Sequence, residues 1–425
     1  MKTCVLLTLA LALAPRSLTA AEIPSAPTSP PRLAVVISID QFRADYLVRF
    51  RPYFGEGGFK RLLDGGADYR NCFYRHAITV TAPGHATILS GVHANIHGIT
   101  ANEWLNRDRW EVESNVEDRD SPLVGLPSHL RLAALHSPQA GRSPKNFQAT
   151  TVGDQLKLRF GANSKVFAAS NKDRSAILLG GKLADSAYWD EGGAFVTSRY
   201  YRNDLPAWVA AFNAEHRAEK SFGSTWNRLL DPAIYDAVQG PDDAPGESSE
   251  NGLTRVFPKK ITGGRPQVSP AFYLAFENDP ASAVMLGEFV QTAIREEKLG
   301  RHAATDLLCV SFSQIDSVGH SYGPDSHELM DSVLRLDRVM ADLLNCLDRE
   351  VGAKNWILVL TADHGIAPLP ERVQELRPAI PAGRINVVEF DTVAKRALDA
   401  AFGPLAPNDY WFVRENTGYH LRPAT

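Results

Sequence analysis

Three short segments of the chain are almost entirely apolar, and each is followed by polar residues. They are Leu33–Ile39, Asp306–Phe312 and Trp356–Leu360. Their apolar residues follow one another without the strict alternation of a strand that has one solvated face. Continuous runs of this length are typical of parallel strands that are covered by helices on both sides. We therefore expect three central strands that are buried on both faces.

The segment between the second and third strands follows a helical period. From Ser326 to Glu350, apolar residues recur at intervals of three and four positions. They are Leu329, Val333, Leu336, Met340, Leu343 and Leu347. This spacing predicts a long helix with one buried face. Because helices alternate with the strands, we predict an α/β fold with a mostly parallel central sheet and helices on both faces.

The stretch from about residue 180 to residue 299 differs from these segments. It is rich in aromatic residues, and residues 239–252 form a loop of mainly Gly, Pro, Asp and Ser. Such a composition marks irregular, solvent-facing structure. We predict that this stretch is a cap inserted into the sheet domain and does not form an independent domain.

Polar side chains follow each of the three predicted strands. Asp40 follows the first strand, Asp316 and His320 come soon after the second, and Asp363 and His364 follow the third. Ligands of open α/β sheets bind beyond the carboxyl ends of the strands, so we expect these five groups at one edge. Carboxylate and imidazole ligands suit zinc, and manganese less well. Each residue alone is as readily a helix cap or a structural side chain, but five of them on three strands favour a metal site.

A further candidate lies in Thr79–Gly91, which reads TVTAPGHATILSG. We expect Thr81 at the N-cap of a helix, with Pro83 in its first turn. A helix N-terminus stabilises negative charge, and a hydroxyl beside a metal ion there can attack phosphorus. Taken alone, Thr81 is more simply explained as a helix cap.

Composition limits the class of protein but not its chemistry. The chain has 425 residues, 44% of them hydrophobic, and 45 Lys plus Arg against 49 Asp plus Glu, a formal net charge of −4. These values are those of a globular protein and disfavour nucleic acid as the main partner. Cys72, Cys309 and Cys346 lack the spacing of metal ligands, and we expect them to be small buried apolar residues.

Residues 1–21 have the pattern of a secretory signal peptide. Lys2 supplies the charged start, Cys4–Ala14 is apolar, and residues 19–21 are small. The apolar run is too short to cross a bilayer as a helix, and we expect no membrane span elsewhere. Residues 22–31, rich in Pro and Ser, are expected to be a linker to a catalytic domain over 32–425. These features predict a periplasmic or secreted protein.

Taken together, the motifs resemble those of the alkaline phosphatase superfamily, and most closely its phosphate-irrepressible, PafA-type branch. The resemblance covers essentially everything after the signal peptide. The stretches that carry it are Val36–Asp45, Thr79–Gly91, Ile96–Trp104, Asn171–Ile177, Asp316–Ser326 and Leu360–Gly365. The order and spacing of these short motifs make the resemblance specific. It implies an alkaline-phosphatase-like catalytic domain with an inserted cap.

Carried onto this sequence, the resemblance implies a site that holds two zinc ions. The ligands that it implies for one ion are Asp40, Asp363, His364 and the Thr81 oxygen. The ligands that it implies for the other are Asp316 and His320. Paired metal ions of this kind stabilise both the attacking and the leaving oxygen of an in-line displacement.

The resemblance also implies an exported phosphate monoester hydrolase. Thr81 would be phosphorylated and inorganic phosphate would then be released, with Asn102 donating a hydrogen bond to a phosphoryl oxygen. Lys172 and Arg174 would bring two positive charges to the phosphoryl group, which is held mostly by electrostatics. A monoester has an extra anionic oxygen, so this pair favours small phosphate monoesters as substrates.

Two related activities have different signatures. Phosphodiesterases and nucleotide pyrophosphatases share the Thr and Asn but generally lack the Lys and Arg pair, and such an activity is the alternative function. Sulfatases need Cys or Ser, then Pro two positions on and Arg four positions on. Here Thr81 and Pro83 are followed by His85, which makes a sulfatase improbable. We interpret His85, His93 and His97 as structural or supporting residues.

The family pattern has a further zinc-ligand histidine in a downstream Gly-Thr-x-His-Gly segment. This sequence stops at Thr425 without such a segment, so we expect a C-terminally truncated domain whose second zinc lacks its third protein ligand. His420 is interpreted as a strand residue and not as a ligand. An inactive phosphoester-binding fragment is therefore a second alternative function. The sequence makes no prediction of oligomeric state.

Overall fold

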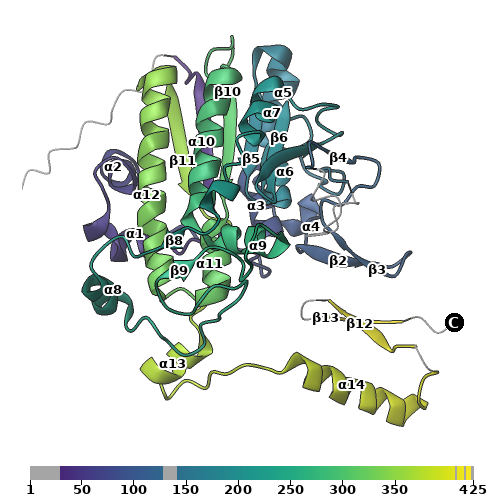
Figure 1. The fold of residues 1–425 in the computed structure, drawn as a ribbon. Helices are drawn as coiled ribbons and strands as arrows, with labels where there is room; N and C mark the ends of the chain where they lie inside the picture. Colours follow the sequence, from purple (N-terminus) through teal and green to yellow (C-terminus); the bar gives the residue numbers. More distant parts are fainter. Residues whose placement is uncertain (1–28, 128–140, 407–408, 416–417, 423–425) are drawn as a thin grey trace, which may run out of the picture. The chain divides into compact units, whose positions relative to one another are not determined.

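The structure is a computed structural model that describes residues 29–127, 141–406, 409–415 and 418–422. Residues 31–425 form one unit, and the elements below belong to it. The predicted signal peptide and most of the predicted linker lie outside the described residues. Figure 1 shows the arrangement of the helices and strands.

A seven-stranded sheet forms the centre of this unit (Figure 1). In spatial order its strands are β11 (Trp356–Thr361), β1 (Leu33–Ile39), β10 (Asp306–Phe312), β5 (Val166–Ser170), β6 (Ser186–Glu191), β7 (Ala194–Ser198) and β4 (Leu123–Val124). The first five strands pair in parallel, and β7 and β4 are antiparallel to their neighbours. The predicted α/β fold with a mostly parallel sheet is confirmed.

The three predicted central strands all form, but they differ in burial. All residues of β10 are buried, and β1 has one partly exposed position. In β11, Ile357 and Val359 are each 53% exposed, so the prediction that this strand is buried on both faces is wrong. The reason is its position at the sheet edge, where Leu358 and Leu360 pack against the core and the opposite face is open to solvent.

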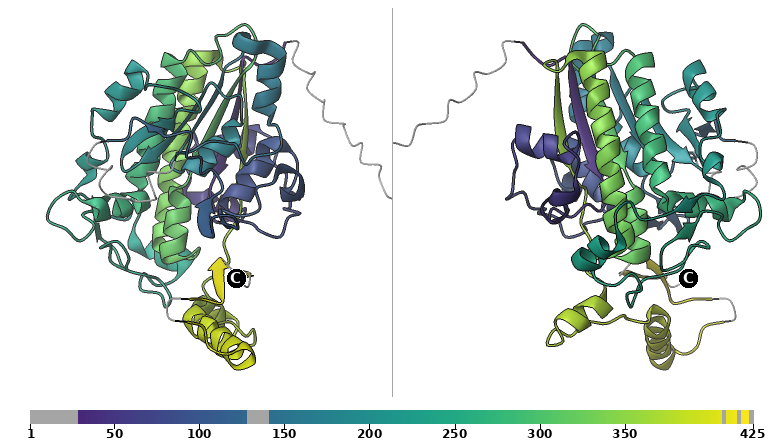
Figure 2. Two further views of the ribbon diagram at one scale, coloured as in Figure 1. Left: turned by 90° about the vertical axis from the view of Figure 1, so that its right-hand side faces the viewer. Right: turned by 60° about the vertical axis from the view of Figure 1, so that its left-hand side comes forward.

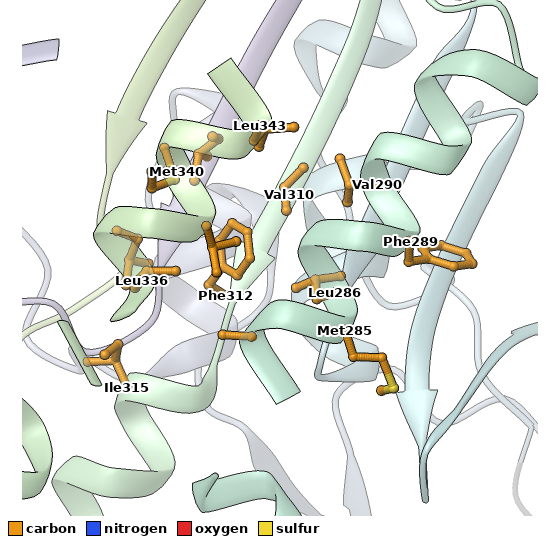
Figure 3. Packing of buried hydrophobic residues seen from close by; sticks show 14 of the residues in the cluster. Met285, Leu286, Phe289, Val290, Val310, Phe312, Ile315, Leu336, Met340 and Leu343 are labelled. Atoms are coloured by element: carbon orange, nitrogen blue, oxygen red, sulfur yellow. The ribbon is translucent and has the colours of Figure 1, made fainter. Parts of the chain in front are cut away.

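Helices cover both faces of the rest of the sheet. On one face, α10 (Pro280–Glu296), α11 (Gln314–Tyr322) and α12 (His327–Leu347) pack against alternate residues of β10, including Val310 and Phe312 (Figure 3). On the other face, α3 (Thr81–Ser90) and α6 (Asp173–Gly180) pack against the intervening residues, including Cys309. Two separate hydrophobic clusters therefore hold the sheet between helical layers.

The predicted long helix is α12, which lies beside α10 along one sheet face (Figure 2). It begins at His327 because the Ser326 side chain caps it by accepting a hydrogen bond from the backbone N–H of Leu329, at 3.1 Å. The α-helix ends at Leu347 and continues as a short π-helical turn, η4 (Asp348–Gly352). The sequence could predict this helix because one of its faces is apolar along its whole length.

The arrangement differs from the inserted cap expected over residues 180–299. Strands β6 and β7 from the start of this stretch belong to the central sheet, and α10 from its end packs on the sheet face. The part between them consists of short elements. They are α7 (Ala207–Asn213), η3 (Glu219–Ser221), α8 (Pro232–Gln239), α9 (Pro270–Asn278) and the two-stranded pair of β8 (Thr225–Trp226) and β9 (Lys259–Lys260).

The remaining elements connect these layers or follow β11. Before the second half of the sheet they are α1 (Tyr46–Arg49), η1 (Arg51–Tyr53), α2 (Phe59–Gly65), α4 (Ala94–His97), β2 (Glu103–Asn106), β3 (Glu111–Ser114), α5 (Val152–Phe160) and η2 (Gly161–Asn163). After β11 come α13 (Pro370–Leu376), α14 (Val387–Phe402), β12 (Phe412–Glu415) and β13 (Gly418–Leu421), the last containing His420 as predicted. Among the described residues, no helix combines the length and apolarity that a membrane span needs.

The cysteines only partly follow the prediction. Cys309 in β10 and Cys346 in α12 are buried, as expected for small apolar residues. Cys72, in the irregular segment before α3, is exposed, so the prediction of a buried residue is wrong there. This segment contributes no regular element whose packing could cover the side chain.

Candidate metal and phosphoryl-transfer site

The candidate site lies beyond the carboxyl ends of three neighbouring parallel strands. Asp40 directly follows β1, Asp316 is in the first turn of α11 after β10, and Asp363 and His364 follow β11. Because the strand order is β11-β1-β10, these ends meet at one edge. Asp40, Asp316 and Asp363 are at most 3% exposed, and His364 is also buried.

Three of these side chains form a group with the geometry of a metal site. One ligand atom each from Asp40, Asp316 and His364 lies within 4.8 Å of the others. His364 Nε2 is 3.2 Å from Asp40 Oδ1 and 3.9 Å from Asp316 Oδ1. Its Nδ1 is 2.8 Å from the carbonyl oxygen of Gly365, which assigns one ring proton to Nδ1. Nε2 faces the carboxylates, and loss of its proton would turn a lone pair towards a metal ion there.

The donor atoms fit a bound zinc ion. Asp40 Oδ1 and Asp363 Oδ2 are buried and accept no hydrogen bond of ordinary geometry within the described residues. Buried carboxylate oxygens normally have such a partner. Here each oxygen faces a histidine ring nitrogen, His364 Nε2 at 3.2 Å from Asp40 Oδ1 and His85 Nδ1 at 3.0 Å from Asp363 Oδ2, and each keeps a lone pair for a cation. Carboxylates with one imidazole form a donor set typical of zinc. His364 Nε2 lies 3.6 Å from Asp363 Oδ2, which puts Asp363 beside the same group.

Lys172 contributes the positive charge nearest to this group. Its Nζ contacts Asp40 Oδ2 at 2.8 Å and also Asp316 Oδ2. Burial would raise the pKa of Asp40, but Lys172 and His364 hold that pKa well below its usual range. Burial would lower the pKa of His364, whereas the hydrogen bond to Asp40 and the charge of Asp363 raise it to about 9. Burial and the charge of Asp40 raise the pKa of Asp363.

His320, predicted to bind the second ion, has a different environment. It is one turn after Asp316 on α11, and its Nε2 is 3.3 Å from Asp316 Oδ1. The contact with Asp316 raises the pKa of His320. Its side chain is 71% exposed, whereas that of Asp316 is 5% exposed. The second predicted ion position is therefore open to solvent on the His320 side.

Thr81 begins helix α3 but does not cap it. The N-cap residue is Val80, and Thr81 is the first helical residue, so the predicted N-cap is displaced by one position. The free N–H of Ala82 instead donates to Asn102 Oδ1 at 2.8 Å. Asn102 therefore serves the helix end through its carbonyl, which leaves its amide N–H groups available for a phosphoryl oxygen. Thr81 itself is 3% exposed.

His85 connects the predicted nucleophile to the metal group. Its Nδ1 is 2.8 Å from the carbonyl oxygen of Thr81 and 3.0 Å from Asp363 Oδ2, and its Nε2 is 2.8 Å from Ser311 Oγ. The side chain is completely buried. Gly84 in the same turn allows close approach, since a Cβ there would lie 2.4 Å from the Asp363 carbonyl oxygen. The structure thus places the first turn of α3 directly against Asp363.

Arg174, unlike Lys172, forms no ion pair with the carboxylate group among the described residues. It follows Lys172 by two positions in α6, and its nearest acidic partner is Asp173, at 3.7 Å from Nη1. Its Nε is buried without a hydrogen-bond partner in the described part of the chain. Asp173 is held by Arg142 Nε at 2.6 Å, an ion pair that the sequence patterns did not suggest. A donor of Arg174 is therefore left for another group.

Gln41 is the contact of the metal group that sequence reasoning missed. It donates from its backbone N–H to Asp363 Oδ1 at 3.1 Å and from Nε2 to Asp316 Oδ1 at 2.7 Å. Its φ is 64°, a conformation uncommon for residues other than glycine. An amide residue after a strand end carries no signal for such a role, because the role depends on this backbone turn.

Comparison with known proteins gives a family and close relatives. A family model described as type I phosphodiesterase / nucleotide pyrophosphatase matches residues 34–422. Alkaline phosphatase PhoV from Synechococcus elongatus is 39% identical over 84% of this chain and 62% of its own length. Alkaline phosphatase PafA from Elizabethkingia meningoseptica is 35% identical over 79% of this chain and 60% of its own length. The chain thus spans about three fifths of the length of these relatives.

The fold is also that of a solved relative. The crystal structure of wild-type alkaline phosphatase PafA matches with a TM-score of 0.80 at 33% identity, over 88% of this chain and 69% of that chain. At this similarity the arrangement of strands and helices is shared. The predicted resemblance to the PafA-type branch is confirmed.

Proposed function

The chain belongs to the type I phosphodiesterase / nucleotide pyrophosphatase family, and from this premise we propose that it is a zinc-dependent phosphate monoester hydrolase, an alkaline phosphatase. One observation carries the proposal. Ligand atoms of Asp40, Asp316 and His364 lie within 4.8 Å of one another, at the sheet edge against which the first turn of α3 packs. The same edge holds the nucleophile candidate, Thr81, through His85.

The proposed metal ligands are divided between two zinc ions. Asp40, Asp363 and His364 would hold one ion together with the Thr81 oxygen. Asp316 and His320 would hold the other. Two bound zinc ions supply positive charge to the attacking and leaving oxygens of an in-line displacement. The burial of the Asp40 and Asp363 carboxylates beside the His364 ring supports this assignment.

The proposed reaction has two displacements at phosphorus. First, the Thr81 oxygen attacks and forms a P–O bond while the P–O bond to the alcohol breaks. The Thr81 proton is lost to solvent, and the leaving alcohol gains one. Water then attacks the phosphothreonine and loses a proton, the P–O bond to Thr81 breaks, the Thr81 oxygen regains a proton, and inorganic phosphate leaves. The position of Thr81 in the first turn of α3 supports this role, because the helix dipole stabilises negative charge at that end.

Positive charge around the phosphoryl group favours monoesters over diesters. Lys172 lies against Asp40 and Asp316, so a phosphoryl group bound beside these carboxylates meets its charge. Arg174 Nε is buried without a hydrogen-bond partner among the described residues, and Asn102 lies beside Thr81, where its side-chain oxygen accepts from the Ala82 N–H. A solved PafA variant carries substitutions of a Thr, an Asn, a Lys and an Arg. The spacing between its Thr and Asn equals that between Thr81 and Asn102, and the spacing between its Lys and Arg equals that between Lys172 and Arg174.

The compartment and partners follow from the same proposal. Export by the signal peptide over residues 1–21 would place the enzyme in the periplasm or outside the cell, where it would act on small phosphate monoesters. The remaining domain over residues 32–425 would then be the catalytic domain. The formal net charge of −4 gives no reason to expect a nucleic-acid partner.

A phosphodiesterase or nucleotide pyrophosphatase is the second candidate, because the matching family model carries that description. The two activities are separated by the zinc-loaded protein acting on an aryl phosphate and on the matched methyl aryl diester. We expect faster hydrolysis of the monoester and loss of that hydrolysis in Thr81→Ala. Equal monoester rates for the wild type and Thr81→Ala would refute the proposed nucleophile, and a strong diester preference would favour the second candidate.

A further inference from the structure

We propose that Gln41 is a positioning residue that fixes the acidic ligands of both predicted zinc ions at the same time. This inference rests on the two-ion site proposed above. Gln41 follows Asp40 at the end of β1 and is 2% exposed. It donates from its backbone N–H to Asp363 and from its side-chain amide to Asp316. One residue therefore contacts or adjoins an acidic ligand from each of the three converging segments.

The backbone conformation of Gln41 makes this double contact possible. Its φ of 64° lies in the left-handed region, which glycine occupies readily and other residues rarely do. With this turn, the N–H points to the residue that follows β11, while the side chain reaches the helix that follows β10. A glycine would take the turn more easily, but it would lack the amide that binds Asp316. The unfavourable backbone conformation of Gln41 is thus accompanied by a specific side-chain contact, the hydrogen bond to Asp316.

Helix α11 has a matching irregularity. Gly319 lies inside this helix, where glycine is unfavourable because it loses more backbone freedom than other residues. A Cβ at Gly319 would lie only 1.8 Å from Gln41 Oε1, so any other residue would displace the Gln41 side chain. Gly319 stands between Asp316 and His320, the two residues proposed to bind the second ion. Two residues with locally unfavourable backbone properties, Gln41 and Gly319, therefore meet in one packing contact.

The chemical consequence is control of carboxylate orientation without added charge. Each hydrogen bond from Gln41 goes to an Oδ1 atom, which fixes the plane of the Asp316 and Asp363 carboxylates. Groups that hold metal ligands in this way typically change metal affinity or activity about 10–100-fold when they are removed. A neutral amide also avoids placing a further negative charge beside Asp40, Asp316 and Asp363.

The test is a four-protein cycle of the wild type, Gln41→Gly, Gly319→Ala and the double variant. Zinc binding is measured by competition with a chromophoric chelator. We expect Gln41→Gly and Gly319→Ala each to weaken zinc binding about 10–100-fold. In the Gln41→Gly background, Gly319→Ala should cause no further loss, because the side chain that it displaces is gone. Wild-type affinity in Gln41→Gly, or the same loss from Gly319→Ala in both backgrounds, would overturn the proposal.

A second readout uses urea unfolding of the same four proteins without metal. Alanine favours a helix over glycine, so Gly319→Ala should stabilise the Gln41→Gly protein and destabilise the wild type. An equal change in both backgrounds would show that Gln41 does not occupy this space. A wild-type protein that binds no zinc would refute the proposed metal-dependent function, and the unfolding cycle would still decide the Gln41 contact.

Discussion

Two lysines in this protein contact buried acidic side chains, and only one of them is at the candidate site. Lys172 contacts Asp40 and Asp316 beyond the carboxyl ends of the parallel strands. Lys259, in β9, is fully buried and lies 2.8 Å from Glu328 Oε1 at the start of α12. Both clusters have carboxylate oxygens that lack a hydrogen-bond partner among the described residues. Burial and pairing alone therefore do not distinguish a functional cluster from a structural one.

The difference lies in the charge balance of the two clusters. Burial by itself lowers the pKa of each lysine. For Lys172, the charges of Asp40 and Asp316 outweigh burial and raise the pKa, whereas for Lys259 the charge of Glu328 does not outweigh it and the pKa stays lowered. Asp40 keeps a pKa well below its usual range, whereas burial raises the pKa of Glu328 to about 7. Burial and the charge of Glu328 raise the pKa of Glu247 to about 9. The two acids that contact Lys172, Asp40 and Asp316, are thus held in the charged form, and Glu247 and Glu328 near Lys259 favour the neutral form.

The largest expected difference is in turnover after the same chemical change in each cluster. Asp40→Asn removes a proposed zinc ligand and should lower kcat/KM for an aryl phosphate by at least about 10³-fold, more than loss of a supporting partner would cost. Glu328→Gln should leave kcat/KM unchanged, because Glu328 touches none of the proposed ligands. Steady-state kinetics of both zinc-loaded variants measure this contrast. Similar losses in the two variants would abolish the distinction between the clusters.

The second difference is in which property each lysine supports. Lys172→Met should slow monoester hydrolysis by about 10²–10³-fold, as loss of one charge-stabilising donor does, and slow diester hydrolysis less. Lys259→Met should keep the ratio of monoester to diester rates and lower the free energy of unfolding by about 3 kcal/mol, the cost of breaking a buried ion pair. Urea unfolding and paired substrate assays compare the variants. A changed substrate ratio in Lys259→Met would contradict the structural role.

The third difference concerns pH. The pKa of Glu247 rises from 4.5 to about 9 on folding, so the folded protein binds this proton more tightly than the unfolded chain. Its contribution to stability is complete below pH 4.5 and is lost as the pH rises through 9. Glu247→Gln should therefore flatten the fall in unfolding free energy over this range. Urea unfolding at several pH values tests this, and an unchanged slope would contradict it.

The smallest effect is expected at the exposed member of the candidate site. His320→Gln changes a side chain that is 71% exposed, so the unfolding free energy of the metal-free protein should change by less than about 0.5 kcal/mol. The variant should nevertheless bind the second zinc more weakly. Calorimetric zinc titration beside urea unfolding separates the two effects. A large loss of stability would mean that His320 belongs to the buried part of the cluster.

Much of the fold could be predicted because its signals are local. The apolar runs gave β1 and β10 with their observed ends, and the spacing of apolar residues gave α12 to within a few positions. The solvated face of β11 could not be predicted, because an edge strand with apolar residues on both faces reads like a central strand. The division of residues 180–299 was also hidden, since β6 and β7 join the sheet only through tertiary pairing.

The residues of the candidate site also differ in whether they could be predicted from the sequence. Asp40, Asp316 and His364 could be predicted because each directly follows or lies close to the end of a recognisable strand, and the structure brings them together. Their supporting residues could not be. Gln41 depends on a left-handed backbone turn, and His85 connects atoms that are hundreds of positions apart along the chain. Contacts of this kind arise only once the strand ends have been brought together.

The central claim is that phosphoryl transfer proceeds through Thr81. The most direct measurement is rapid acid quenching of the zinc-loaded protein during turnover of an aryl phosphate, followed by mass spectrometry of its peptides. The account predicts a phosphoryl group on Thr81, and none when Thr81→Ala is treated identically. Undiminished turnover with no phosphorylated Thr81, or with the phosphoryl group on another residue, would contradict it.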